Sequence, residues 1–235
     1  MTTRLVLIRH GITEWNIQKR YCGYRDVSLS EQGKAQVVKL RAGLKNISID
    51  KIYCSDRKRA LATRAILFGR SDFVKVMGLR EINFGVLEGL KHDEIMEKYP
   101  EVYQEWLTNP YKGRIPQAEP MQVFKKRVRG SINKILRFNR GKTIAVVCHG
   151  GVIGIFLSSI LKSRDFWSHV PSPASVTIVE YKNNKFNIKK LPQIYRAVFC
   201  FKKFYWATTG VLVAAGKLLT IIETSLLVAV WPYQP

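Results

Sequence analysis

The sequence contains few cysteines, and they form no recognisable framework. Its four cysteines make no CxxC pair and follow no regular spacing (Cys22, Cys54, Cys148 and Cys200), which argues against a disulfide scaffold. The N-terminal stretch MTTRLVLIRH runs directly into an apolar segment, without the architecture of a secretory signal. We therefore expect a reducing, cytoplasmic setting in which the thiols behave as small apolar side chains.

Acidic residues are also scarce, with 17 Asp and Glu against 39 Lys and Arg, so the formal net charge is +22. A field of this sign attracts polyanions, anionic membranes and phosphorylated small molecules alike, and it sets a class of partner without choosing among them. The hydrophobic share of 46% is that of a packed globular protein and excludes a disordered chain.

Short apolar runs alternate with amphipathic segments along the first 190 residues. The expected strands are 4–8, 51–54, 143–148, 176–181 and 186–191, and Asn183 and Asn184 form a plausible hairpin turn between the last two. Because strands alternate with helices, the sequence predicts an α/β fold, a three-layer α/β/α sandwich around a mainly parallel central sheet. No internal repeat is evident.

Two of the expected helices have capping residues at their starts. Ser28 and Glu31 have capping-box spacing before a helix with an apolar repeat. Ser55 and Asp56 can cap the segment RKRALATRAIL, which places Arg59 in the first turn of its helix.

Two arginines and two histidines follow the ends of predicted strands: Arg9, His10, Arg59 and His149. In an open α/β sheet, ligands bind at the carboxyl ends of the strands, so these side chains are expected to converge on one crevice. Each of them alone is weak evidence, because a lone histidine or arginine usually has a structural or solvated role. Their joint placement predicts a site for an anion.

The same residues resemble the histidine phosphatase superfamily, also called phosphoglycerate mutase-like. The motifs occur in the family's order between about residues 3 and 191. They are Arg9-His10-Gly11 with Thr13, Glu14 and Asn16, then Gly23 with DVSLSEQG at 26–33, then Ser55 and Asp56 with Arg59-Ala60 and Thr63, then Leu79, Glu81, Phe84-Gly85 and Glu88-Gly89, and finally Cys148-His149-Gly150-Gly151. This combination is far more specific than an isolated RHG tripeptide.

The resemblance implies a role for each of these residues. His10 is the implied nucleophile, which forms a phosphohistidine, while Arg9, Arg59 and, if cationic, His149 hold the phosphoryl oxygens. Glu81 is the implied acid and base. The implied substrate-binding positions are Asn16, Gly23 and Gly150. No metal or other cofactor is implied, because these cations neutralise the phosphate and the histidines lack HxxxH spacing.

The segment between the Glu81 motif and the later helix is short, Lys91 to Pro120, where mutase members usually carry a longer insertion. A shorter lid leaves a phosphohistidine open to water, which favours hydrolysis of a small phosphorylated metabolite over mutase-type transfer. The pattern looks most like the compact bacterial phosphatases that include α-ribazole phosphatase, whose substrate is one candidate. Nearby, Glu88 and Glu119 are expected to be surface carboxylates, and Pro116–Pro120 departs from the family's Pro-x-Gly-Glu-Ser.

A function of another class would use the basic side chains. The helix that buries Phe124 and Val128 has a basic opposite face: Lys125, Lys126, Arg127, Arg129 and Lys134. With the KKFYW stretch at 202–206, this face would suit an inactive, nucleic-acid-binding relative. The complete catalytic set argues against that alternative, and a basic helix face is usually solvated, so nucleic acid is not the expected partner.

The chain is expected to divide into a catalytic domain, residues 1–195, and a hydrophobic C-terminal extension, residues 196–235. Residues 204–231 are long enough to span a bilayer, but Lys217 and Glu223 lie inside this stretch and are costly at the membrane centre. A membrane tether, a helix packed on the domain and a disordered or non-native extension are the three interpretations that the sequence leaves open. The oligomeric state is open too, a homodimer included.

Overall fold

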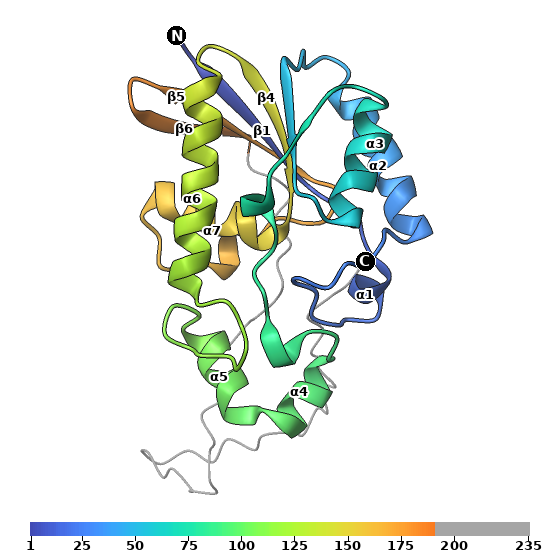
Figure 1. Cartoon of the computed structure of the whole chain (residues 1–235), viewed down its shortest axis with the longest axis vertical. Coiled ribbons are helices and arrows are strands. Elements are labelled where there is room, and N and C mark those ends of the chain that lie inside the picture. The colour runs from blue at the N-terminus through green and yellow to red at the C-terminus, as the bar shows by residue number, and fades with distance from the viewer. Residues whose placement is uncertain (191–235) are drawn as a thin grey trace, which may run out of the picture. The chain divides into compact units, whose positions relative to one another are not determined.

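The computed structural model describes residues 1–190, which form a six-stranded sheet with helices on both faces (Figure 1). The strands are β1 (Thr3–Arg9), β2 (Lys51–Cys54), β3 (Val74–Lys75), β4 (Thr143–Cys148), β5 (Val176–Lys182) and β6 (Lys185–Lys190), in the order β3-β2-β4-β1-β5-β6. The first four are parallel, whereas β5 and β6 join the sheet antiparallel to their neighbours. The predicted α/β/α sandwich with a mainly parallel sheet is confirmed.

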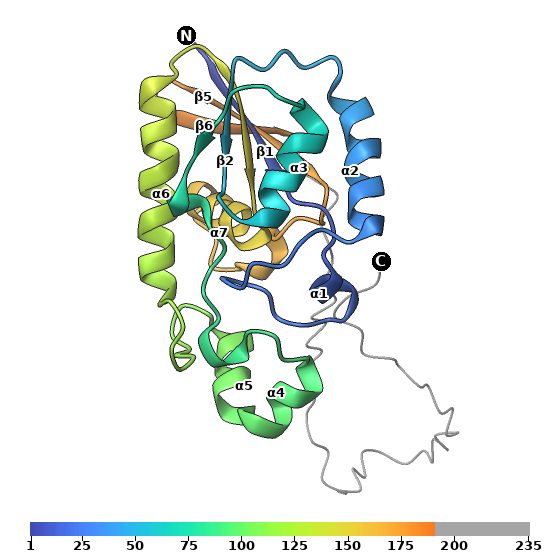
Figure 2. The ribbon, with the colours of Figure 1, turned by 45° about the vertical axis from the view of Figure 1, so that its right-hand side comes forward.

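The helices are α1 (Glu14–Ile17), α2 (Glu31–Leu44), α3 (Lys58–Phe68), α4 (His92–Lys98), α5 (Pro100–Thr108), α6 (Met121–Phe138) and α7 (Gly150–Leu161). Helices α2 and α3 pack together on one face of the sheet, and α6 packs against α7 on the other (Figure 2). Helices α4 and α5 lie beyond the carboxyl ends of the parallel strands. They are therefore at the edge where a ligand site is expected.

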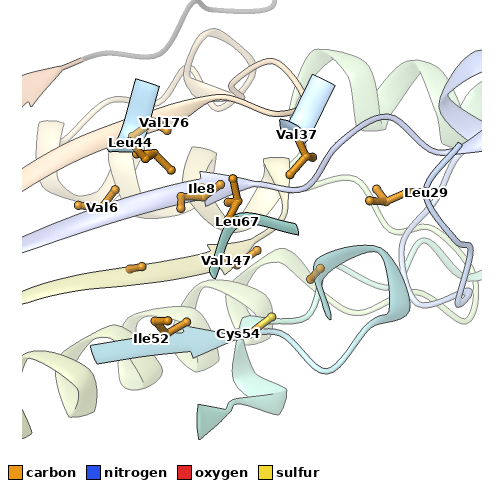
Figure 3. Packing of buried hydrophobic residues seen from close by; sticks show 12 residues of the cluster. Val6, Ile8, Leu29, Val37, Leu44, Ile52, Cys54, Leu67, Val147 and Val176 are labelled. Carbon is orange, nitrogen blue, oxygen red and sulfur yellow. The ribbon is translucent and has the colours of Figure 1, made fainter. Parts of the chain in front are cut away.

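The central strands are buried on both faces, which explains their unbroken apolar sequences. On the side of α2 and α3, Val6, Ile8 and Val147 of the sheet pack against Val37 and Leu67 of the helices (Figure 3). A layer of this kind fixes the register of each strand, because a shift by one residue would exchange buried and exposed side chains. Residues that follow a strand are thereby placed as firmly as the strand itself.

The two predicted helix starts are corrected by the structure. The N-cap of α2 is Ser30, whose Oγ accepts the N–H of Gly33 at 3.0 Å, two residues later than expected. No residue before α3 caps it with a side chain, and the N–H of Lys58 is donated instead to Asp26 from another loop, at 2.7 Å. Ser55 and Asp56 were expected to cap α3, but Ser55 is hydrogen-bonded to His149 and Asp56 is paired with Arg80.

The hairpin between β5 and β6 is confirmed. Asn183 and Asn184 have φ angles of 51° and 59°, as a two-residue turn of type I′ requires, and asparagine tolerates this conformation well. The strands pair directly on either side, with Lys182 opposite Lys185.

The extension 196–235 and its stretch 204–231 lie outside the described residues, so the domain boundary near residue 195 and the membrane tether stay predictions. Among helices within residues 1–190, none has the length and apolar character needed to cross a bilayer.

Candidate active site

The polar side chains predicted to converge lie at the carboxyl edge of the sheet. Arg9 ends β1, and His10 follows it with its N–H donated to the carbonyl of Cys148 at the end of β4, at 3.1 Å. Arg59 lies in the first turn of α3, just past β2, and His149 directly follows β4. Adjacent parallel strands thus bring residues from distant parts of the sequence together.

His10 is a neutral imidazole with a defined tautomer. Its Nδ1 lies 2.7 Å from the carbonyl oxygen of Gly11, and because a carbonyl only accepts, Nδ1 carries the proton and the lone pair is on Nε2. Burial lowers the pKa of His10 well below its ordinary value, and the positive charges of Arg59 and Arg9 lower it further. An imidazole in this state is a nucleophile at neutral pH.

Arg59 is fully buried, and the backbone of a neighbouring loop holds its guanidinium in place. Nη2 donates to the carbonyl of Gly23 at 2.7 Å and Nη1 donates to that of Arg25 at 2.8 Å. Nε–H points at Nδ1 of His149, 3.2 Å away. The arginine is therefore fixed in orientation and keeps its charge inside the protein.

His149 is held as a neutral imidazole too, so the condition for its role as a cationic donor is not met in this structure. Its Nδ1 accepts from Arg59, so the proton is on Nε2, which donates to Oγ of Ser55 at 2.8 Å. Burial, followed by the charge of Arg59, lowers the pKa of His149 well below its ordinary value. In this state His149 fixes Arg59 and lies against His10, the ring centroids being 5.1 Å apart.

Arg9 retains a buried donor without a protein partner. Its Nη1 donates to the carbonyl of Pro171, whereas its Nε is buried and makes no hydrogen bond within the described residues. A Cβ on Gly150 would lie 2.9 Å from Cζ of Arg9, so glycine at the start of α7 leaves space for the guanidinium. An unpaired cationic donor in a closed site is suited to an anion.

Glu81 follows the 3-10 turn Met77–Leu79 and is buried. One carboxyl oxygen, Oε2, accepts the N–H of Gly151 at 2.8 Å and the other, Oε1, accepts the N–H of Ile82 at 3.0 Å. Burial raises the pKa of Glu81 in spite of these hydrogen bonds and of the nearby arginines. A carboxyl group with a raised pKa can deliver a proton near neutral pH.

If Glu81 is the acid that the family resemblance implies, Gly151→Ala should reduce turnover of phosphomonoesters by about 10²-fold, because a Cβ would lie 2.3 Å from Oε1 of Glu81 and displace its carboxyl group. Gly43→Ala in α2 is the control: its Cβ would meet nothing within 4 Å, so it should leave turnover unchanged and stabilise the fold by about 0.5–1 kcal/mol. Steady-state rates and urea unfolding of both variants test this. Equal rates in both would show that Glu81 does not need this position.

The predicted substrate-binding residues have structural roles of their own. Asn16 belongs to a capping box at the start of α1, where its Oδ1 accepts the N–H of Thr13 at 3.0 Å, which fixes the side-chain amide. Gly23 supplies the carbonyl that holds Arg59, and Gly150 makes room for Arg9. Contact of Asn16, Gly23 and Gly150 with substrate stays a prediction.

Glu88 and Glu119 are not the surface carboxylates that we expected. Glu88 accepts the N–H of Tyr24 at 2.6 Å and that of Arg25 at 2.7 Å, so it shapes the loop that holds Arg59. Glu119 forms a two-pronged ion pair with Arg127, at 2.6 and 2.7 Å. The only signal for Glu88 was its place in the family motif, and the only one for Glu119 was its place at the glutamate of the Pro-x-Gly-Glu-Ser pattern.

Arg127 was expected on the solvated basic face of α6, and this expectation is wrong. Besides Glu119, its guanidinium donates to the carbonyls of Gly78, Arg80 and Glu81 at 3.1, 2.7 and 2.8 Å. A second ion pair, between Arg80 and Asp56, ties the same segment to the loop after β2. Arg127 therefore positions the backbone that carries Glu81.

Arg127→Met should destabilise the fold by about 3 kcal/mol, because it leaves Glu119 and three carbonyls without their partner. It should also displace the carboxyl group of Glu81 and so lower any turnover that depends on that group. The matched control is Lys126→Met, an exposed neighbour in the same helix, for which we expect a change within about 0.5 kcal/mol. Urea unfolding distinguishes them, and similar midpoints would contradict the positioning role.

Within the described residues, no three His, Cys, Asp or Glu side chains form a group that could hold a metal ion. Metal-independent action stays a prediction. The site therefore places two arginines and a neutral imidazole together at the carboxyl edge of an α/β sheet, a combination suited to an anion such as a phosphoryl group.

Comparison with known proteins identifies the family to which this chain belongs. Residues 5–193 match the histidine phosphatase superfamily (branch 1), and the chain belongs to that superfamily. It is 30% identical to phosphoserine phosphatase 1 of Hydrogenobacter thermophilus over 198 residues, covering 80% of this chain and 91% of that protein. It is 32% identical to a probable phosphoglycerate mutase, GpmB, of Cronobacter sakazakii over 160 residues, covering 67% and 74%. A solved structure of a proposed α-ribazole-5′-P phosphatase from Escherichia coli K-12 superimposes with a TM-score of 0.75 at 25% identity, covering 81% of this chain and 96% of that one.

Proposed function

We propose that this protein is a phosphatase that hydrolyses small phosphomonoesters through a phosphohistidine on His10. The observation that carries the proposal is the state of His10, a neutral ring whose Nδ1 proton is held by a carbonyl while burial, and then the charges of Arg59 and Arg9, lower its pKa. These features leave the Nε2 lone pair available for attack on phosphorus.

The reaction takes two steps. In the first, Nε2 of His10 bonds to phosphorus, the ester P–O bond breaks, and Glu81 gives its proton to the leaving alkoxide. In the second, Glu81 as carboxylate takes a proton from water, whose oxygen bonds to phosphorus as the P–N bond breaks. Arg9 and Arg59 stabilise the phosphoryl oxygens in both steps, because they hold their charge in a buried site.

Hydrolysis is favoured over transfer because the segment between the Glu81 motif and α6 holds only two short helices, α4 and α5. Candidate substrates follow from the relatives, one named a phosphoserine phosphatase and another a proposed α-ribazole-5′-P phosphatase. Phosphoglycerate mutase-type transfer is the second candidate, because one relative is named a probable mutase.

The test is release of inorganic phosphate from p-nitrophenyl phosphate, phosphoserine, α-ribazole 5′-phosphate and 3-phosphoglycerate, with EDTA present. We expect turnover that is independent of metal ions and a preference for one of the metabolites. Conversion of 3-phosphoglycerate to 2-phosphoglycerate without phosphate release would replace hydrolysis by transfer. Folded protein that is inactive on the whole panel would contradict the proposal for these substrates.

A further inference from the structure

A groove with a volume of about 1030 Å³ lies apart from the active site, between α6, the second half of α7 and the β5–β6 hairpin. Figure 1 shows these elements side by side at one edge of the sheet. None of the active-site side chains lines this groove. The proposed phosphatase reaction gives it no role.

The walls of the groove carry only positive charge. Its charged lining residues, within the described part of the chain, are Lys125, Arg129, Arg137, Arg140 and Lys182. Glu180 precedes Tyr181 on β5, but it does not line the groove and pairs with Arg4 at 2.9 Å. A groove lined by several cations without a facing carboxylate attracts an anionic partner.

The cations are arranged in a row. Lys125, Arg129 and Arg137 recur with Asn133 at intervals of four residues along one side of α6, so the row is about 18 Å long. A row of this length matches a partner with repeated charges better than a single phosphate. Arginine also favours phosphate oxygens, because its planar group can donate two parallel hydrogen bonds.

The floor of the groove is apolar and partly aromatic. Phe186 lies between Tyr181 and Phe156, with ring centroids 4.8 and 5.5 Å away, and all three residues line the groove. Val128 and Ile160 complete the apolar surface. Aromatic rings beside a row of cations provide the two elements with which proteins hold single strands, stacking of bases and charge on the backbone.

We propose that this groove binds single-stranded nucleic acid, with the phosphates along α6 and the bases over Tyr181 and Phe186. The concave shape argues against a bilayer surface, which is flat and would touch only the rim. The site is separate from the catalytic one and adds a binding function to an active enzyme. It therefore differs from the inactive nucleic-acid-binding protein considered for the sequence.

The experiment measures binding of a fluorescein-labelled 20-nucleotide oligo(dT) to the full chain by fluorescence anisotropy at several salt concentrations. The variant Arg129→Ala/Arg137→Ala removes two charges from the groove, and Lys39→Ala/Arg41→Ala removes two exposed charges from α2 on the other face of the sheet. We expect the groove variant to raise Kd at least tenfold and to reduce the slope of log K against log salt by about 1.4, since each contact contributes about 0.7. The α2 variant should bind as the wild type does.

Several results would overturn the proposal: absence of binding, equal weakening by both variants, equal affinity for duplex, or competition by phosphatidylserine vesicles at the same charge concentration. Turnover of p-nitrophenyl phosphate should be unchanged in both variants. Failure of binding with intact turnover thus contradicts the groove proposal alone.

Discussion

His10→Ala abolishes turnover, with kcat lower than that of the wild type by at least about 10⁴-fold. In the proposed mechanism the substitution removes the atom that forms the covalent intermediate, and the neighbouring histidine of the described site is not placed to replace it. His149, 5.1 Å away by ring centroids, has both nitrogens engaged, by Arg59 and by Ser55. The loss should therefore be much the same for every phosphomonoester.

The measurement pairs steady-state rates with rapid quenching into alkali, in which a phosphohistidine survives, and peptide mapping. Wild type should yield a phosphorylated peptide that contains His10, and the variant should yield none. His92→Ala is the control, because His92 contacts Tyr103 outside the site, at 3.2 Å, and should keep activity within about tenfold. An active His10→Ala protein, or a phosphoryl group on another residue, would disprove the nucleophile.

The convergence of Arg9, His10, Arg59 and His149 could be predicted because each lies at or just past the carboxyl end of a parallel strand that the sequence indicates. Parallel strands end at one edge, so four positions far apart in the sequence share one site. Glu81 follows no strand of this kind, and only the family resemblance marked it. Its burial and its hydrogen bond to Gly151 depend on long-range packing.

Residues that act through long-range contacts were the ones missed. Arg127 follows the helical period onto the polar face of α6, and nothing local shows that the segment of Glu81 covers that part of the face. Ser28 and Ser30 are similar as caps in the sequence. Long-range contacts select Ser30 as the N-cap of α2, because its N–H and its hydroxyl both donate to the carbonyl of Ile12, at 3.0 and 3.1 Å.

Glu81→Gln should lower turnover of alkyl phosphates such as phosphoserine by about 10²–10⁴-fold, the usual contribution of a general acid. The same substitution should have a much smaller effect on formation of the phosphohistidine from p-nitrophenyl phosphate, whose phenolate leaves without a proton. The difference between the two substrates separates loss of the acid from a general collapse of the site. Pre-steady-state bursts of the leaving group, p-nitrophenolate or serine, together with steady-state rates on both substrates measure it.

The pH dependence gives the same prediction an independent test. Burial raises the pKa of Glu81 above its ordinary value, and the acid form exists only below that pKa, so turnover of alkyl phosphates should fall as pH rises through it. His10 acts in the other direction, because its lowered pKa keeps it neutral well into the acidic range. In the Glu81→Gln variant this fall in turnover on the alkaline side of the pH–rate profile should disappear, since glutamine does not titrate. If the alkaline fall in turnover persists in the variant, another group gives the proton to the leaving alkoxide, and Glu81 has a structural role beside Gly151.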